Sequence, residues 1–115
     1  MSERCLFCRI ASGAQEADVV ASGDTWVAFR DINPQAPTHV LLVPRRHLES
    51  VEELRDEHRG LAADLLLAAR DVAREEGLAA DGYRLVINTG RKSGQSVFHL
   101  HLHLLGGREM TWPPG

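Results

Sequence analysis

Three histidines alternate with leucines near the C-terminal end of this 115-residue chain, at His99, His101 and His103. In a strand, this period of two places the imidazoles on one face and the leucines on the other. A neutral imidazole can act as a nucleophile, pass a proton or bind a metal ion. Along an extended strand, neighbouring imidazoles start about 6.6 Å apart and the outer two about 13 Å apart. We therefore expect the three rings to have different tasks rather than to share one ion.

Cys5 and Cys8 form a Cys-x-x-Cys pair and are the only cysteines of the sequence. Such a pair is typical either of a redox-active dithiol or of half a tetrahedral zinc site. No βαβ pattern surrounds it, as a thioredoxin-like motif would require, so the zinc interpretation is favoured. That interpretation needs two further ligands. Two cysteines are too few for the disulfide framework of a small secreted domain.

The loop Gly94-Gln95-Ser96 precedes the first of the three histidines. A glycine lets backbone amides approach an anion, and a serine hydroxyl adds a further donor. Phosphoryl transfer needs donors of this kind aimed at the phosphate oxygens. Alone the motif is weak evidence, and it gains weight from its place beside the histidines.

The longest helix that the pattern predicts runs from Ser50 to about Glu76. Ser50 and Glu53 have the spacing of a capping box, and Gly77 suits the position after a helix end. Gly60 lies inside this stretch and indicates a kink or a break. One stripe follows the 3-4 spacing of an amphipathic helix. Its members are Val51, Leu54, His58, Leu61, Leu65, Ala68 and Val72.

Strands are predicted for most of the remaining sequence. Residues 19–21 and 26–29 flank a Ser-Gly-Asp turn and suit a hairpin, and residues 39–43 form an apolar run between two prolines. Residues 83–87 and 97–105 alternate apolar and polar side chains. This order predicts an α+β fold with a mainly antiparallel sheet. Phe98, Leu100, Leu102 and Leu104 are expected to pack on the helix stripe and complete the core.

The composition, with 43% hydrophobic and 25% charged residues, is that of an ordinary globular domain, and we expect residues 1–115 to form one domain. A net charge of −3 argues against general nucleic-acid binding. The acidic residues are concentrated in residues 49–76, which leaves the rest of the chain mildly positive, as suits a phosphate-bearing ligand. No apolar run is long enough to span a membrane and no signal-peptide pattern follows Met1, so we expect a cytoplasmic protein.

The segment His99–Leu105 resembles the signature of the histidine-triad (HIT) superfamily. In that signature, three histidines alternate with apolar residues, and a further apolar residue ends the motif. The resemblance extends to Asp31–His39, to Gly94–Val97 and to Gly106–Gly115, whose final Trp-Pro-Pro-Gly is similar to the nucleotide-binding branch called Hint. It implies a HIT-like fold: a five-stranded, mainly antiparallel sheet, one long helix and a short N-terminal helix. It also implies a homodimer with a continuous sheet, in which Trp112 reaches toward the partner's active site.

The resemblance implies hydrolysis at the α-phosphorus of a purine nucleoside 5′-phosphoramidate or a related aminoacyl adenylate, with release of AMP. His101 would be the nucleophile and form a nucleotidyl-histidine, which water then hydrolyses. His103 and Ser96 match positions that contact the phosphate. His39 matches an additional active-site histidine that orients or tunes His101.

The resemblance also implies the residues that hold the nucleotide, AMP or GMP. Asp31 matches a position on the ribose hydroxyls, where a carboxylate can accept two hydrogen bonds. Asn88 matches a contact to phosphate or ribose oxygens, and Gly94 and Gln95 belong to the phosphate loop. The apolar walls around the purine correspond to Leu6, Phe7, Ile10, Phe29 and Ile32.

HIT proteins that retain an N-terminal Cys-x-x-Cys have metal ligands that match Cys5, Cys8, His47 and His99. The resemblance thus implies a closed, structural Zn²⁺ site that does not itself activate water. No organic cofactor is expected. His58, which lies in the acidic helix, is expected on the surface.

Two other functions stay open at this point. One is a nucleotide-binding or partner-binding module in which catalysis is incidental. The other is a dinucleoside polyphosphate hydrolase, which the Hint-like C-terminus disfavours. Neither nucleic acid nor a membrane is expected as a partner.

Overall fold

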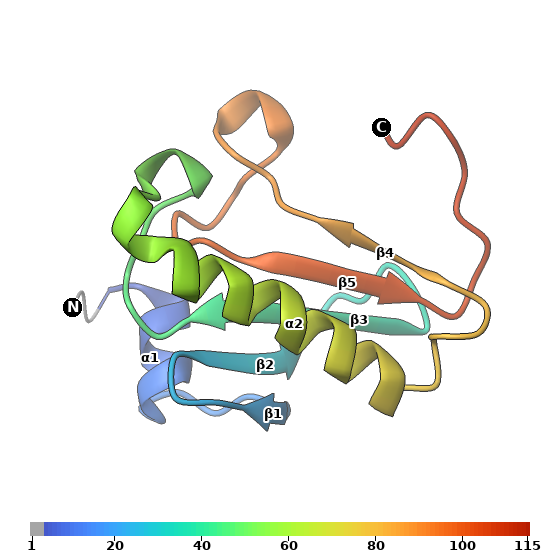
Figure 1. Cartoon of the computed structure of the whole chain (residues 1–115), viewed down its shortest axis with the longest axis horizontal. Helices are drawn as coiled ribbons and strands as arrows, with labels where there is room; N and C mark the ends of the chain where they lie inside the picture. The colour runs from blue at the N-terminus through green and yellow to red at the C-terminus, as the bar shows by residue number, and fades with distance from the viewer. Residues whose placement is uncertain (1–3) are drawn as a thin grey trace.

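Within residues 4–115, five antiparallel strands in the order β1-β2-β3-β5-β4 form one sheet (Figure 1). The computed structural model describes residues 4–115. The strands are β1 (Val19–Ser22), β2 (Trp26–Arg30), β3 (Thr38–Pro44), β4 (Tyr83–Val86) and β5 (Leu102–Gly106). The helices are α1 (Leu6–Ser12) and α2 (Arg59–Glu75), with short 3-10 turns η1 (Val51–Glu53), η2 (Asp56–His58) and η3 (Arg91–Ser93). The expected α+β class, with its long helix and short N-terminal helix, is confirmed.

The central strand β3 divides its side chains between two apolar cores. Val40 and Leu42 pack under α2, which lies across one face of the sheet (Figure 1). Leu41 and Val43 point to the other face, where they pack with residues of α1. This alternation explains why the run is apolar throughout, since a strand covered on both faces has no solvent side. Within residues 4–115 no helix is long and apolar enough to cross a membrane.

The predicted helix over residues 50–76 is divided into three pieces. Ser50 caps η1 by accepting a hydrogen bond from the backbone of Glu52 at 3.2 Å, but extended backbone at Leu54 and Arg55 ends that turn. The continuous helix begins only at Arg59, so the break falls before Gly60 rather than at it. Gly77 has a φ of +77° and follows the helix end, as predicted.

The expectation that His58 is a surface residue is wrong. Its side chain is only 5% exposed, and its Nδ1 accepts a hydrogen bond from the Arg55 backbone at 2.9 Å. His58 follows the apolar stripe of the helix, and this spacing was the signal that its acidic neighbours obscured. The burial of Leu65, Ala68 and Val72 confirms the inner part of the stripe.

The predicted strand over residues 97–105 is regular only from Leu102 onward. Before it, the chain bends, and the backbone N–H of Leu100 donates to the Leu48 carbonyl at 2.6 Å instead of joining the sheet ladder. Leu100, Leu102 and Leu104 pack under α2 as expected. Phe98 does not, because it lies beyond the regular strand and is 46% exposed.

Candidate active site

The sheet face that packs against α1 also carries the candidate catalytic histidines. The antiparallel register of β3 and β5 makes His39 and His103 diagonal neighbours on this face. The ring of His101, just before β5, lies 5.0 Å from that of His103 between centroids. Asp31 follows β2, and its backbone N–H donates to the His39 carbonyl at 3.0 Å. The fold therefore brings residues from three separate segments to one place.

A cavity of about 580 Å³ opens beside these histidines. Its volume and its mostly apolar lining with a few polar groups are typical of small-molecule sites. Nine of the expected site residues line it: Leu6, Phe7, Ile10, Phe29, Asp31, Ile32, Ser96, His101 and His103. The sequence interpretation missed Gln15, Glu16, Ala17, Asp18, Arg30, Leu41 and Val97. The apolar residues expected around the purine and several of the polar residues expected around the phosphate and ribose thus line the same cavity.

The proton on the His101 ring is fixed by a main-chain carbonyl. Its Nδ1 lies 2.7 Å from the carbonyl oxygen of His99. A carbonyl oxygen can only accept, so Nδ1 carries the hydrogen and donates. In the neutral ring, Nε2 then keeps a free lone pair. This is the nitrogen that a nucleophilic or proton-accepting imidazole needs.

His39 and His103 are linked by a directional hydrogen-bond chain. The backbone N–H of Gln35 donates to His39 Nδ1 at 3.0 Å, which puts the proton of the neutral His39 ring on Nε2. His39 Nε2 in turn lies 2.9 Å from His103 Nδ1 and 3.5 Å from an Asp31 carboxylate oxygen. As the acceptor of the shorter contact, His103 keeps its own proton on Nε2. A neutral His103 is therefore a hydrogen-bond donor at the cavity wall.

Burial keeps all three of these rings uncharged at neutral pH. Desolvation lowers the pKa of His101, against opposing effects of the His99 carbonyl and Asp31. It also lowers the pKa of His39, which Asp31 partly opposes. Burial, with the nearby imidazoles of His101 and His39, lowers the pKa of His103 from 6.5 to about 4. The site therefore favours neutral imidazoles at neutral pH.

Asp31, His39 and His103 lie close enough together to be considered as a metal group. The hydrogen bond from Gln35 argues against that use, because it occupies Nδ1 of His39. A metal ion on Nε2 would then leave that ring with no nitrogen for its proton and force it to become an anionic imidazolate. A hydrogen-bond relay explains the short His39–His103 contact without this cost.

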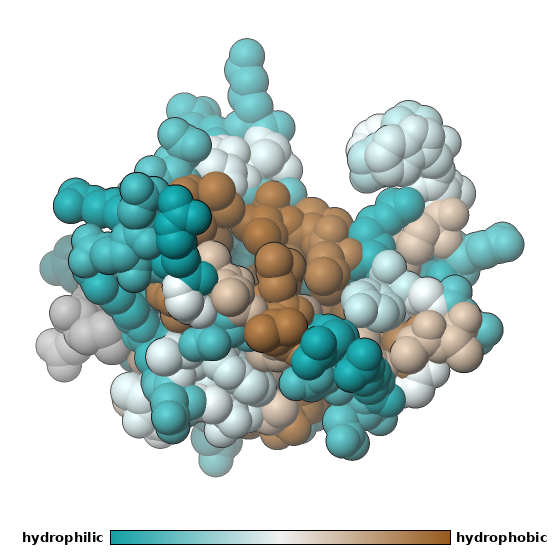
Figure 2. Space-filling view, in the orientation of Figure 1, coloured by the Kyte–Doolittle hydropathy of each residue, from teal (hydrophilic) through white to brown (hydrophobic). Residues whose placement is uncertain are grey.

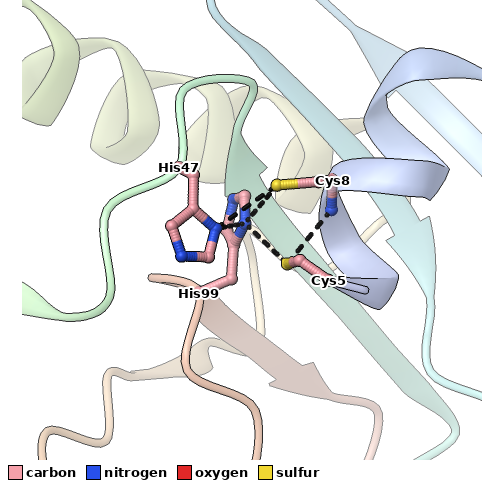
Figure 3. Close-up of side chains that lie close together, drawn as sticks. All are labelled: Cys5, Cys8, His47 and His99. Atoms are coloured by element: carbon pink, nitrogen blue, oxygen red, sulfur yellow. Dashed lines mark hydrogen bonds between the residues drawn. The ribbon is translucent and has the colours of Figure 1, made fainter. Parts of the chain in front are cut away.

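A second cluster consists of Cys5, Cys8, His47 and His99 (Figure 3). The cysteines come from the start of α1, His47 from the loop after β3, and His99 from the bend before β5. His99 Nε2 lies 2.8 Å from the Pro44 carbonyl and therefore carries the hydrogen, which leaves Nδ1 free to face the sulfurs. Fixing the second nitrogen in this way is typical of metal-binding histidines.

The spacing of the four donor atoms fits a tetrahedral metal ion. The Nδ1 atoms of His47 and His99 are 3.2 Å apart, and three sulfur–nitrogen distances are 3.3, 3.3 and 3.5 Å. Zinc bonds of about 2.0–2.1 Å to nitrogen and about 2.3 Å to sulfur require edges of about 3.3 and 3.6 Å. The four residues expected as ligands are therefore assembled as a possible closed Cys₂His₂ site.

Four expected site residues, His39, Asn88, Gly94 and Gln95, lie outside the cavity lining. Gln95 is buried and its side chain is bound to main chain: it donates to the Glu49 carbonyl at 2.7 Å and accepts from the Gly90 N–H at 2.8 Å. These bonds hold the shape of the loop that presents Ser96. Gly94 has a φ of +92°, which a glycine tolerates at this turn.

Arg30 was missed by the sequence interpretation, although it directly precedes Asp31. It lines the cavity and forms a bidentate ion pair with Glu76, in which the two guanidinium nitrogens donate to the two carboxylate oxygens at 2.8 and 3.0 Å. Its guanidinium lowers the pKa of Glu76, and the same contact raises the pKa of Arg30. The pair ties the end of β2 to the end of α2 and so supports the segment that carries Asp31.

Comparison with known proteins agrees with this geometry. The HIT domain family matches residues 12–110 of the chain. A purine nucleoside phosphoramidase of Escherichia coli (strain K12) is 43% identical over 110 residues, which cover 96% of this chain and 92% of that protein. A solved HIT family hydrolase from Legionella pneumophila Philadelphia 1 is 51% identical with a TM-score of 0.96, and the match covers 97% of this chain and 100% of that one. A zinc-bound histidine triad family protein from Mycobacterium smegmatis is 33% identical with a TM-score of 0.77, covering 91% and 76%.

The chain belongs to the HIT domain family, as the histidine motif predicts. Its relatives and its fold identify it as a hydrolase of that family. The Cys-x-x-Cys pair and its two histidines form a possible metal site within the same fold.

Proposed function

We propose that this protein hydrolyses the P–N bond of purine nucleoside 5′-phosphoramidates, such as adenosine 5′-phosphoramidate, or the P–O bond to the aminoacyl group of related aminoacyl adenylates. The observation that carries the proposal is the short contact between His101 Nδ1 and the His99 carbonyl, which leaves Nε2 as a free nucleophile. The similarity to a purine nucleoside phosphoramidase supports the substrate class. Together they favour the Hint branch of the family.

The reaction proceeds in two displacements at the α-phosphorus. The Nε2 lone pair of His101 forms a bond to phosphorus while the P–N bond breaks, and the amine leaves with a proton taken from the solvent-exposed side of the site. Water then attacks the nucleotidyl-histidine, gives up a proton and releases AMP with the imidazole restored. A covalent intermediate of this kind divides one difficult step into two easier ones.

The groups around His101 have separate tasks in this proposal. The Nε2–H of His103 and the hydroxyl of Ser96 donate to the phosphate oxygens, where negative charge gathers in the transition state. His39 positions His103 through the 2.9 Å contact. Asp31 accepts hydrogen bonds from the ribose hydroxyls. The purine lies against the apolar lining, whose members include Leu6, Phe7, Ile10, Phe29 and Ile32.

We also propose that the Cys₂His₂ cluster binds Zn²⁺. The donor set and the 3.2–3.5 Å spacing of its atoms suit tetrahedral zinc, and one solved relative is described as zinc-bound. Zinc held by four protein ligands supplies structural stability and has no open position for water. The ion would join α1, the loop after β3 and the bend before β5.

A homodimer is proposed on the basis of exposed apolar surface beside an edge strand. Leu66 of α2 is 54% exposed, and among the residues that the structure describes β4 has no neighbour on its outer side in the sheet. Asp64 accepts a hydrogen bond from Thr25 near β1 and β2, so Leu66, about 200° further around the helix, points toward β4. Figure 2 shows apolar surface gathered over the middle of α2 and beside it. A second copy packed there would cover it.

The test is incubation of the protein with adenosine 5′-phosphoramidate and, separately, with diadenosine polyphosphates. We expect release of AMP from the first, and no activity from His101→Ala, which should still fold and bind AMP. Preferred cleavage of the dinucleotides would instead identify a dinucleoside polyphosphate hydrolase. A wild-type protein that binds AMP but turns over neither substrate would be a binding module.

A further inference from the structure

His99 connects the proposed metal site to the proposed nucleophile through a single residue. Its ring directs Nδ1 toward Cys5 and Cys8, at 3.3 and 3.5 Å. Its main-chain carbonyl accepts the hydrogen bond from His101 Nδ1 at 2.7 Å. A ligand bound by the His99 ring therefore also restrains the His99 backbone. The carbonyl of that backbone determines which ring nitrogen of His101 is free.

Phe7 makes a second, independent connection between the two sites. It lies between the two cysteines in the sequence and lines the cavity. Its ring meets those of His99 and His101 edge to face, with centroids 6.0 and 5.0 Å away. Cys8 and Phe7 both belong to α1, and the backbone N–H of Cys8 contacts the Cys5 sulfur at the start of that helix. A displacement of the cysteine sulfurs would therefore also move the Phe7 ring, which lines the cavity and contacts His101.

The segments around both histidines of the cluster are also bound to each other. The Leu100 N–H donates to the Leu48 carbonyl at 2.6 Å, so the residue after His99 is bound to the residue after His47. All four donor side chains are partly or fully buried. The loop after β3 and the bend before β5 consequently form one unit around the donor atoms.

From these contacts we infer that metal binding at Cys5, Cys8, His47 and His99 is energetically coupled to nucleotide binding, through the His99 carbonyl and the Phe7 ring. The inference rests on the proposed nucleotide-binding function. The metal acts here as a positioning group: it fixes the orientation of His101 and the cavity wall without touching the substrate. Coupling between two sites is reciprocal, so a nucleotide must then tighten metal binding by the same factor.

The test measures both halves of this linkage. AMP affinity is determined by calorimetry for zinc-loaded protein and for protein stripped with a chelator, and zinc affinity is determined by chelator competition with and without saturating AMP. We expect removal of zinc to weaken AMP binding by about fivefold or more, and AMP to tighten zinc binding by an equal factor. Equal affinities in the two states would overturn the inference. Loss of the helical circular dichroism signal on stripping would also overturn it, because zinc would then be a condition for folding.

A matched pair of variants locates the coupling. Phe7→Leu and Leu6→Ala each change one apolar residue of the cavity wall beside a cysteine, and both are expected to weaken AMP binding. Phe7 contacts both His99 and His101, so only Phe7→Leu should reduce the coupling factor. An equal coupling factor in the two variants would contradict the role of Phe7.

The His99 carbonyl is tested without nucleotide. Nitrogen-15 chemical shifts of the His101 ring should report one tautomer, with the proton on Nδ1, in zinc-loaded protein and a mixture after stripping. An unchanged tautomer would overturn this link. If zinc-loaded protein fails to bind AMP, both the proposed function and the coupling to nucleotide fail, whereas an unchanged tautomer in protein that does bind AMP overturns only the link through the His99 carbonyl.

Discussion

At the scale of single residues, main-chain groups decide what each histidine can do. The His99 carbonyl gives His101 a free Nε2, the Gln35 N–H gives His39 a proton on Nε2, and these are different assignments for chemically identical rings. The alternating sequence pattern predicts a shared face and cannot predict these partners. The partners depend on backbone bends outside the regular strand, and a residue pattern does not specify those bends.

The relay from Gln35 to His103 predicts a specific defect for His39→Ala. Without the His39 ring, the His103 ring loses its orienting hydrogen bond and its Nε2–H is no longer aimed at the phosphate. We expect kcat for adenosine 5′-phosphoramidate to fall about 100-fold, with little change in KM, because a small misplacement has an effect of this order. Gln35→Ala is the control, since it keeps the main-chain donor. Equal losses in the two variants would contradict the relay.

The depressed pKa of His103 predicts that acid destabilises the protein. In the unfolded chain the imidazole titrates near 6.5, whereas in the fold its pKa is about 4. As the pH falls below about 6.5 the unfolded state takes up the proton first, so the free energy of unfolding should decrease until about pH 4 and change little above 6.5. Tm recorded at several pH values is the measurement. His103→Asn should flatten the profile, and an unchanged slope in that variant would argue against this origin.

At the scale of elements, the sequence predicts which faces meet better than where elements end. Leu100, Leu102 and Leu104 pack under α2 as their alternation requires, although only two of them lie in β5. The helix start is misplaced because Ser50 caps a 3-10 turn, and local capping signals do not distinguish that turn from an α-helix. Burial of His58 follows from the stripe, which outweighs its charged neighbours.

The end of regular β5 predicts unequal effects for two residues of the same apolar row. Leu102 is 2% exposed, so Leu102→Ala should reduce the free energy of unfolding by about 2–5 kcal/mol. Phe98 lies beyond the strand, and Phe98→Ala should cost less than about 1 kcal/mol. Urea denaturation of both variants checks this. Comparable losses would show that Phe98 belongs to the core after all.

At the scale of the whole molecule, the sheet separates two kinds of surface. One face, with α1, holds the cavity and the Cys₂His₂ cluster, and the other, with α2, holds the larger apolar core. Figure 1 shows α2 lying across the sheet. The apolar surface between α2 and β4 is left exposed in a single chain (Figure 2). The cavity and the exposed apolar surface therefore lie on different parts of the molecule, and the proposed dimer would cover the apolar surface.

The proposed dimer predicts that one charge at Leu66 separates the subunits. Leu66→Glu places a carboxylate in the apolar surface beside β4, whereas Val19→Glu places one on the opposite edge strand at a residue of similar exposure, 48% against 54%. Sedimentation velocity should give a dimer for the wild type and Val19→Glu, and a folded monomer for Leu66→Glu. A wild-type monomer, or a dimer in all three, would contradict this interface.

Rapid quenching followed by mass spectrometry can detect whether His101 carries the nucleotidyl group during turnover, as proposed. Protein mixed with excess adenosine 5′-phosphoramidate is stopped within the first turnover and digested under mildly alkaline conditions that preserve a phosphohistidine-type bond. We predict one added adenylyl group on the peptide that contains His101, absent from His101→Ala. An adduct on another residue, or AMP release by His101→Ala at the wild-type rate, would show that His101 is not the nucleophile.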